Sequence, residues 1–247
     1  MEPLRPLAVE LSEMPQFVHE AVAGYLAALN GPEDPLVSEA RAHSKADGVP
    51  AIAPETGWLL HVLAVLAASR RILEIGTGYG CSGLRLARAL GPDGMLFTIE
   101  RDPARAAIAR QHFERAGLSS CVSVMVGEAV RLVHKVAGPF DLIVQDGSKD
   151  QYEPALDRLV GLLRPRGVLV SDNILWQGDV IPGFCAEPAH SAESTAIIAR
   201  YSRRLAADPR LATVFLPVGD GVAVSVRRDE EAPDERPAEE AGAAFPS

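Results

Sequence analysis

Short apolar runs alternate with longer amphipathic stretches along most of the chain. From residue 71 onward, five runs rich in Val, Ile and Leu are each followed by a polar or amphipathic stretch. These runs are residues 71–75, 95–100, 121–126, 141–146 and 167–172. Apolar runs of this length are typical of strands buried on both faces, and their alternation with helices is typical of a parallel sheet. The pattern predicts an α/β fold.

Two of the helices between these strands are marked by their ends. Asp102 followed by Pro103 is a typical helix start, apolar residues recur at helical spacing over 106–116, and Gly117 ends the pattern. A second set of apolar residues at helical spacing covers 156–163, before a Pro and a Gly. Both helices are expected to connect neighbouring parallel strands.

The two ends of the chain follow different patterns. Residues 212–218 and 221–228 are β-rich and flank a Gly-Asp-Gly turn, which predicts an antiparallel C-terminal hairpin at one edge of the sheet. Three amphipathic stretches before residue 71 predict an N-terminal helical cover: residues 17–29, 35–43 and 54–68. We therefore expect a doubly wound, seven-stranded, mostly parallel sheet.

Composition divides the chain into three parts. Its 247 residues are 47% hydrophobic, which is enough for one sizeable core. We expect a folded domain over 51–228, preceded by the helical cover over 1–50. Residues 229–247 hold seven acids and one arginine and supply six of the nine net negative charges. Because this segment has too few apolar residues to offset its ordering entropy, it is predicted to be a disordered acidic tail.

The charge balance and the cysteines narrow the setting. An acidic chain lacks the basic face expected of a nucleic-acid-binding protein, so DNA is not expected as a partner and a small molecule is. No window approaches the roughly 20 apolar residues of a membrane span, and the N-terminus lacks a secretion signal. Cys81, Cys121 and Cys185 show no C-x-x-C spacing, which indicates neither a disulfide framework nor a zinc site. A cytoplasmic protein is expected.

A glycine-rich loop follows the first predicted strand. Gly76, Gly78 and Gly80 alternate between the strand at 71–75 and the next helix, and such a turn lets a ligand touch the backbone. The following strand ends in Glu100, whose carboxylate can accept two hydrogen bonds from the vicinal hydroxyls of a ribose. The combination predicts a nucleoside cofactor.

Two other interpretations of this loop were weighed. A nicotinamide-dependent oxidoreductase would have G-x-G-x-x-G, whereas this chain has Cys81 at the last glycine position and Glu74 two residues before the first glycine. A tight turn with no ligand is the default for an isolated glycine pair. Glu100 at the next strand end favours a cofactor over that default.

Polar residues also follow two later strands. Asp146 ends one, and Asp172 and Asn173 follow another, so their side chains are expected to meet at the carboxyl edge of the sheet. Two carboxylates and an amide oxygen are hard ligands suited to Mg²⁺. Each residue alone is more simply explained as a cap or turn, but their convergence favours a divalent-metal site.

Several of these motifs together resemble the cation-dependent O-methyltransferases, which include catechol and caffeoyl-CoA methyltransferases. The motifs are LEIGTGYG, TIE, DGSKDQY and DN, with APETG at 53–57 and LAADPRLATVFLPVGDGVAVSV near the C-terminus. The resemblance spans about residues 51–228. It implies a Rossmann-like S-adenosylmethionine-dependent methyltransferase that uses a divalent cation such as Mg²⁺ to methylate a hydroxyl oxygen.

The resemblance also implies roles for individual residues. Asp146, Asp172 and Asn173 would bind the metal, with Asp146 and Lys149 taking part in catalysis and Lys149 acting as the general base. Glu100 would hold the ribose, Glu128 the adenine amino group and Ser82 the methionine carboxylate. The full set expected at the cofactor is Ile52, Glu74, Gly76, Thr77, Gly78, Ser82, Glu100, Arg101, Gly127, Glu128, Ala129 and Asp146.

The chain departs from the family pattern at three places. Glu128 stands where the family usually has Asp, many bacterial relatives read D-A-D-K where this chain has D-G-S-K at 146–149, and an aromatic residue near the cofactor is replaced by Cys81. The expected partner is a hydroxylated aromatic small molecule, and a homodimer is expected. A hydroxylated uridine of tRNA, or a regulatory protein that binds the cofactor without turnover, is the alternative.

The surroundings of the expected acceptor site leave further alternatives open. Lys149 would act as a base or form a surface ion pair with Asp146 or Asp150, and Trp176 would wall the acceptor site or pack in the core. Residues 177–191, which contain Gly and Pro without periodicity, are expected to form a mobile loop over the substrate. None of the six histidines is assigned chemistry.

Overall fold

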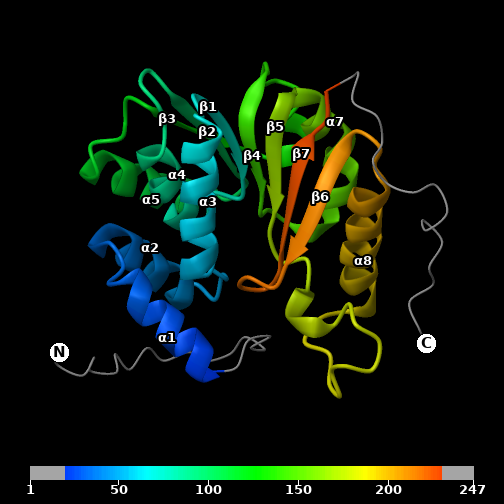
Figure 1. The fold of residues 1–247 in the computed structure, drawn as a ribbon. Helices are drawn as coiled ribbons and strands as arrows, with labels where there is room; N and C mark the ends of the chain where they lie inside the picture. Colours follow the sequence, from blue (N-terminus) through cyan, green and yellow to red (C-terminus); the bar gives the residue numbers. More distant parts are fainter. Residues whose placement is uncertain (1–19, 230–247) are drawn as a thin grey trace.

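The computed structural model of the chain describes residues 20–229 and contains one seven-stranded sheet (Figure 1). The strands are β1 (Arg71–Ile75), β2 (Met95–Glu100), β3 (Val122–Val126), β4 (Phe140–Gln145), β5 (Leu163–Ser171), β6 (Leu211–Leu216) and β7 (Val222–Arg227). Their order is β3-β2-β1-β4-β5-β7-β6, and only β7 runs antiparallel to its neighbours. The predicted mostly parallel sheet with an antiparallel C-terminal hairpin is confirmed.

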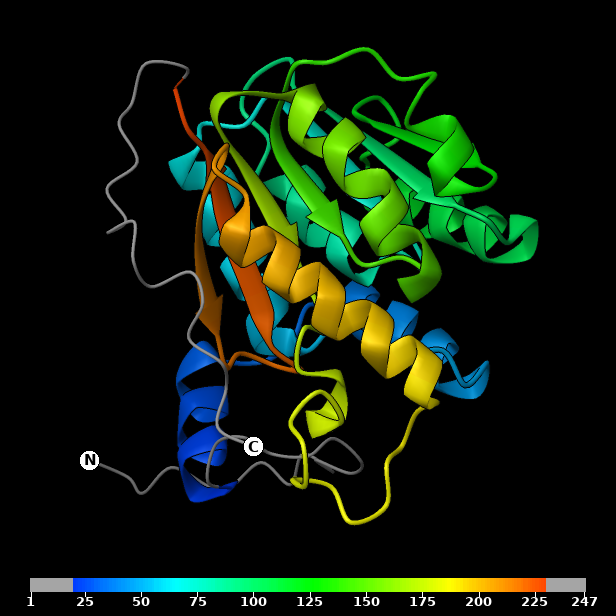
Figure 2. The ribbon, with the colours of Figure 1, turned by 90° about the vertical axis from the view of Figure 1, so that its right-hand side faces the viewer.

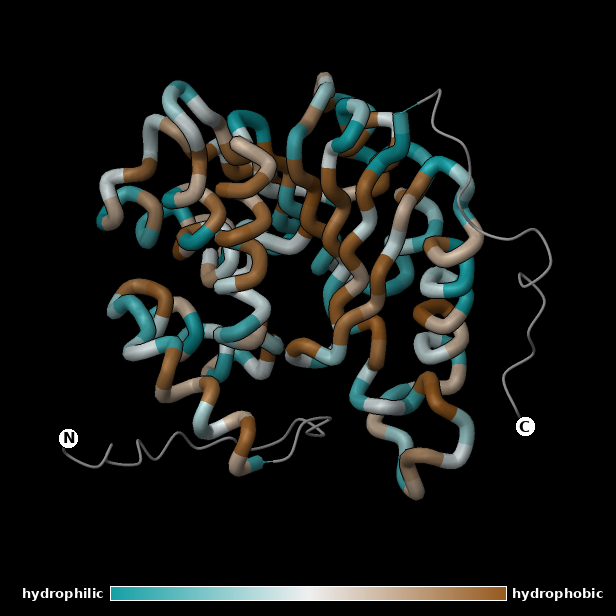
Figure 3. Tube along the Cα trace, viewed as in Figure 1, coloured by the Kyte–Doolittle hydropathy of each residue, from teal (hydrophilic) through white to brown (hydrophobic). Residues whose placement is uncertain are grey.

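Helices cover both faces of this sheet (Figure 2). They are α1 (Glu20–Asn30), α2 (Pro35–Ala46), α3 (Pro54–Leu66), α4 (Cys81–Arg88), α5 (Pro103–Arg115), α6 (Ala129–Leu132), α7 (Tyr152–Leu162) and α8 (Ala192–Ala207). Residues of α2 to α5 share one buried apolar cluster with the sheet, and residues of α6 to α8 share the other. The central strands, mostly brown in Figure 3, lie between the two clusters and are inaccessible to water on both faces.

The helix boundaries agree with their capping residues. The Asp102 carboxylate accepts hydrogen bonds from the backbone N–H groups of Ala104 and Arg105 at the start of α5, and Gly117 has a φ of +70° just after its end. Two features were not predicted. Leu163, assigned to a helix, begins β5, where it pairs with Phe140, and the 16-residue helix α8 had not been recognised.

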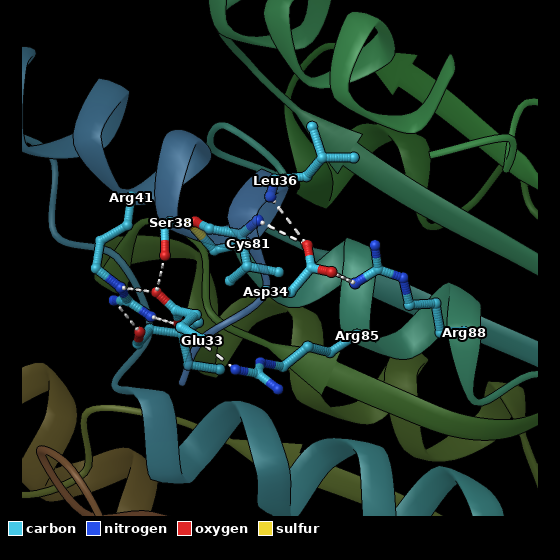
Figure 4. A network of polar contacts seen from close by, with 10 residues as sticks. Glu33, Asp34, Leu36, Ser38, Arg41, Cys81, Arg85 and Arg88 are labelled. Atoms are coloured by element: carbon cyan, nitrogen blue, oxygen red, sulfur yellow. Dashed lines mark hydrogen bonds and ion pairs between the residues drawn. The ribbon is translucent and has the colours of Figure 1, made fainter. Parts of the chain in front are cut away.

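The predicted N-terminal helices lie against α4 and the edge of the glycine loop. The Glu33 carboxylate binds the Arg41 guanidinium through two hydrogen bonds of 2.8 and 3.0 Å and lies 3.4 Å from Arg85 (Figure 4). Asp34 caps α2 and pairs with Arg88 at 3.2 Å. Because Arg85 and Arg88 belong to α4, this network fastens the helical cover to the sheet layer.

Within residues 20–229 no helix is long and apolar enough to cross a membrane. The residues 17–19 of the first predicted helix and residues 230–247 of the acidic tail lie outside the described part of the chain. Figure 1 shows α1 and α2 together with the loop after β5 at the lower end of the molecule, where β5 ends. The candidate site lies at this end.

Candidate active site

A cavity of about 710 Å³ lies at the carboxyl ends of the parallel strands. The glycine loop after β1, the end of β2, the segments after β4 and β5, and the first turns of α8 all contribute to its lining, and residues 49–53 close one side. Open α/β sheets bind their ligands at this edge, where neighbouring loops diverge. The cavity therefore contains both of the regions that the sequence singled out.

The glycine loop approaches the segment after β4 more closely than a side chain would permit. Gly76, Gly78 and Gly80 have φ values of +97°, +51° and +95°. A Cβ atom on Gly76 would lie 2.2 Å from the backbone oxygen of Asp146, whereas one on Gly78 would meet nothing within 4 Å. The first glycine is thus required by both conformation and space, and Gly78 by conformation alone.

Glu100 is held at the end of β2 by two backbone N–H groups. Gly78 N donates to Oε2 at 2.8 Å and Asp102 N donates to Oε1 at 2.9 Å. The side chain is 6% exposed and lines the cavity. These bonds use one position on each oxygen and leave the remaining lone pairs available to hydroxyl groups in the cavity.

Glu74 is the one predicted cofactor residue that does not line the cavity. It is fully buried beneath the glycine loop, where its Oε2 accepts a hydrogen bond of 2.6 Å from Thr98, which in turn bonds to Thr77. Burial raises the pKa of Glu74 to about 7, although hydrogen bonds from Ser82 and Thr98 oppose the shift. A direct contact with a ligand in the cavity does not fit this position; the carboxyl supports the loop from below.

The other predicted cofactor residues lie around the cavity. Its lining includes Ile52, Gly76, Thr77, Gly78, Ser82, Glu100, Arg101, Gly127, Glu128, Ala129 and Asp146. Glu128, though exposed, accepts a short hydrogen bond from the Gln151 side chain. Gln151 also accepts one from Val130 N at 3.3 Å. Sequence reasoning had not singled out Gln151, which fixes the position of the Glu128 carboxylate.

Lys149 lies at the centre of the second polar cluster. Its Nζ donates to Asn173 Oδ1 at 2.6 Å and to the Tyr152 hydroxyl at 2.7 Å, and lies 3.6 Å from Asp146 Oδ1. The lysine side chain is only 13% exposed. A surface ion pair is therefore the wrong description of this residue. Tyr152, fully buried, anchors the arrangement by donating to backbone oxygens after β4 and β5.

The charges of this cluster are incompletely balanced. Burial raises the pKa of Asp172, and the neighbouring Asp146 raises it further; burial also raises the pKa of Asp146 against the attraction of Lys149. Burial lowers the pKa of Lys149, against the attraction of Asp146 and Asp172. Two buried carboxylates beside one lysine carry more negative charge than the lysine offsets, and an additional cation would relieve this.

The donor set fits a divalent cation with oxygen preference. Asp146, Asp172 and Asn173 supply three oxygen-bearing side chains to one cavity, and Asn173 has a φ of +58°. Among residues 20–229 there is no group of three His, Cys, Asp or Glu side chains suited to a metal ion. Mg²⁺ does not need one, because water and substrate commonly complete its octahedron around one or two carboxylates.

The acceptor end of the cavity contains residues that sequence reasoning missed. Asp220, from the hairpin turn, accepts from Gln177 N at 2.7 Å and lines the cavity. His190 also lines it: its Nδ1 lies 2.8 Å from Asp179 Oδ2, and its ring stacks on Trp176 with the centroids 3.8 Å apart. The Gly-Asp-Gly turn marked Asp220 only as a turn residue, and no sequence signal joined Asp179 to His190.

Comparisons with known proteins agree with this architecture. A family model described as O-methyltransferase matches residues 35–228. A catechol O-methyltransferase of Niastella koreensis is 36% identical over 220 residues, which cover 85% of this chain and 97% of that protein. A catechol O-methyltransferase of Mycobacterium tuberculosis is 35% identical over 79% of this chain and 90% of its own.

Solved structures of O-methyltransferases superpose on the chain. One from Bacillus cereus in complex with SAH has a TM-score of 0.73 at 30% identity and covers 84% of this chain and 97% of its own. TomG from Streptomyces achromogenes, in complex with SAM, has a TM-score of 0.74 at 30% identity and covers 85% and 96%.

Proposed function

This chain belongs to the O-methyltransferase family, and on that premise we propose that it transfers the methyl group of S-adenosylmethionine to a hydroxyl of a small aromatic compound in a divalent-metal-dependent reaction. One observation carries the proposal: a single cavity contains both the glycine loop with Glu100 and the cluster of Asp146, Lys149, Asp172 and Asn173. A nucleoside and a hydroxylated ring bound at these two ends would face each other.

The cofactor is proposed to lie along the glycine loop. Glu100 would accept hydrogen bonds from the ribose hydroxyls, and Glu128, positioned by Gln151, would accept one from the adenine amino group. Ser82 would bind the methionine carboxylate at the start of α4. Arg101, Gly127 and Ala129 would complete the adenine side, with Ile52 on the wall across from the loop.

Asp146, Asp172 and Asn173 are the proposed ligands of the divalent cation, which would supply Lewis acidity that lowers the pKa of the acceptor hydroxyl. The chain itself holds and orients the proton acceptor. Tyr152 and Asn173 fix Lys149 Nζ at one point of the cavity, and burial favours its neutral form.

The proposed transfer is a single displacement. The acceptor O–H proton passes to the neutral Lys149 Nζ, the oxygen forms a bond to the methyl carbon, and the carbon–sulfur bond breaks. Its electron pair stays on sulfur, so that S-adenosylhomocysteine and the methyl ether are the products. Holding the two reactants in line removes most of the entropic cost of the encounter.

The cavity favours a small, weakly charged acceptor. Seven acidic residues line it, against Arg101, Arg105, Lys149 and one histidine. Even with a bound divalent cation, such a surface does not attract a phosphate-rich chain. A phenolic compound is therefore favoured over a tRNA uridine, and the intact proton-transfer cluster favours turnover over a purely regulatory role.

A homodimer is proposed to form through an apolar face. Tyr25 and Leu29 of α1, Val65 and Leu66 of α3 and Val214 of β6 are between 50% and 76% exposed. These three elements lie on the same side of the molecule in Figures 1 and 2. Contiguous exposed apolar surface is typical of an interface. The three free cysteines fit the reducing cytoplasm, which we propose as its location.

Calorimetric titration with S-adenosylhomocysteine, followed by methyl transfer to catechol with Mg²⁺ and then with EDTA, tests the proposal. Cofactor binding and EDTA-sensitive transfer are expected. Transfer that EDTA leaves unchanged would remove the metal role from Asp146, Asp172 and Asn173, and absence of cofactor binding would contradict the proposed function as a whole.

A further inference from the structure

His190 and its surroundings form a built polar site at the acceptor end of the cavity. The histidine immediately precedes α8, and its side chain is 22% exposed. Its ring lies flat on Trp176, with an interplanar angle of 25°, so one face of the tryptophan is covered. The imidazole, and not that face of the indole, is therefore the aromatic surface that this part of the wall presents.

Asp179 fixes the orientation and the tautomer of this imidazole. The buried Asp179 carboxylate accepts hydrogen bonds from His190 N at 2.9 Å and Ala189 N at 3.3 Å in addition to its contact with His190 Nδ1. Although burial opposes it, these three bonds lower the pKa of Asp179. An ionised carboxylate only accepts, so Nδ1 carries the proton and the neutral ring has a lone pair on Nε2.

Nε2 has no hydrogen-bond partner among residues 20–229, and the histidine lines the cavity. Lys149 Nζ lies 5.6 Å from the centre of the Trp176 ring, on which His190 stacks. A substituted aromatic ring held beside Lys149 is therefore within reach of His190. Glu193 and Asp220 also line this end, and they disfavour a carboxylate on the acceptor.

We propose that His190 is a specificity-determining residue that accepts, through Nε2, a hydrogen bond from a hydroxyl or amine substituent of the acceptor ring, and that Asp179 is its positioning residue. The inference rests on the proposed methyl transfer and adds to it the class of acceptor: a neutral or cationic hydroxylated ring that carries a second hydrogen-bond donor away from the reacting oxygen. Selection by a buried hydrogen bond is stronger than selection by size, because a missing donor leaves the site's polar group unpaired.

The test compares matched acceptors under one set of conditions. Hydroxymethylcatechols and ethylcatechols, each substituted at ring position 3 or 4, differ in a hydrogen-bond donor but hardly in size. With the full-length protein, Mg²⁺ and S-adenosylmethionine, kcat/KM is expected to be about three- to tenfold higher for the hydroxymethyl compound at one ring position, which is the range of a single neutral hydrogen bond.

Three variants assign this preference. His190→Phe preserves the stacking on Trp176 and is expected to reduce the ratio of kcat/KM values to about one, while the value for the ethyl compound changes less than about twofold. His190→Gln, which keeps an acceptor near the position of Nε2, should retain part of the preference. Asp179→Asn should raise KM for the hydroxymethyl compound more than it lowers kcat. His134→Gln, at an exposed histidine that does not line the cavity, is the control.

The outcomes separate this inference from the function on which it rests. An unchanged ratio in His190→Phe, or an equal loss for both acceptors, would assign His190 a structural role only and overturn the inference while leaving methyl transfer intact. Absence of transfer to every catechol by the wild-type protein would overturn both.

Discussion

The cofactor end and the acceptor end of the cavity are constructed differently. At the cofactor end, Glu100 is held by backbone N–H groups of its own loop and of the glycine loop. At the acceptor end, side chains from distant segments hold each other: Lys149 binds Asn173, and Asp220 binds the backbone of Gln177. A backbone-built site depends on local conformation, whereas a side-chain-built site depends on the whole fold bringing its members together.

This difference makes the glycine loop the most sensitive point, because it touches both ends. We expect Gly76→Ala to abolish measurable S-adenosylhomocysteine binding, since its Cβ would overlap the Asp146 backbone oxygen at 2.2 Å. Gly78→Ala is the matched control: it meets no atom within 4 Å, so only the cost of a left-handed alanine, about 1–2 kcal/mol of stability, is expected. Calorimetric titration and urea unfolding measure both effects. Equal affinities in the two variants would contradict the close-contact argument.

The acceptor end should respond in rate and not in cofactor affinity. Lys149→Ala is expected to lower kcat by about 10²- to 10⁴-fold, the usual contribution of a positioned proton acceptor. Binding of S-adenosylhomocysteine should change little, because the known contacts of Lys149 are to Tyr152 and the acidic cluster. Lys135→Ala removes an exposed lysine and serves as the control. A variant at position 149 that keeps half of the wild-type kcat would remove Lys149 from the proton-transfer role.

The same contrast explains what the sequence could predict. The glycine loop and Glu100 are local signals at strand ends, so the sheet, its hairpin and the cofactor end were anticipated. His190 and Asp179 are eleven residues apart in an aperiodic segment, and only the fold brings them against Trp176. Glu74 was placed in the cavity because of its distance from Gly76. However, it shares a face of β1 with Ile72, the face that packs under α4.

Glu74 provides a third test, in stability, because a buried carboxyl supports the loop from below. Its pKa is raised from 4.5 to about 7. Between these values the unfolded chain releases the proton while the folded chain keeps it, so the free energy of unfolding falls as pH rises from about 4.5 to 7 and then levels off. The contribution amounts to about 3 kcal/mol at most.

Glu74→Gln should remove this pH dependence. Urea unfolding at pH 5 and pH 8 is expected to show wild-type stability falling relative to the variant by up to about 3 kcal/mol, since a neutral amide has no proton to lose. Glu114→Gln, at an exposed position of α5, is the control and should leave the pH profile unchanged. A profile for Glu74→Gln parallel to that of the wild type would mean that the carboxyl titrates in its ordinary range.

The smallest expected effect concerns the one place where the cofactor end depends on a distant side chain. Arg41 of α2 donates through Nη1 to the backbone oxygen of Ile52 at 2.7 Å, and Glu33 holds the guanidinium in that orientation. Arg41→Met retains the apolar length of the side chain but releases Ile52, so the dissociation constant of S-adenosylhomocysteine should rise about three- to tenfold, the value of one hydrogen bond. Arg115→Met removes an exposed pair with Glu39 that does not touch the cavity wall, and its dissociation constant should equal that of the wild type. If both variants bind equally well, the wall at Ile52 is set by its own backbone, and the cofactor end is as local as its loop suggests.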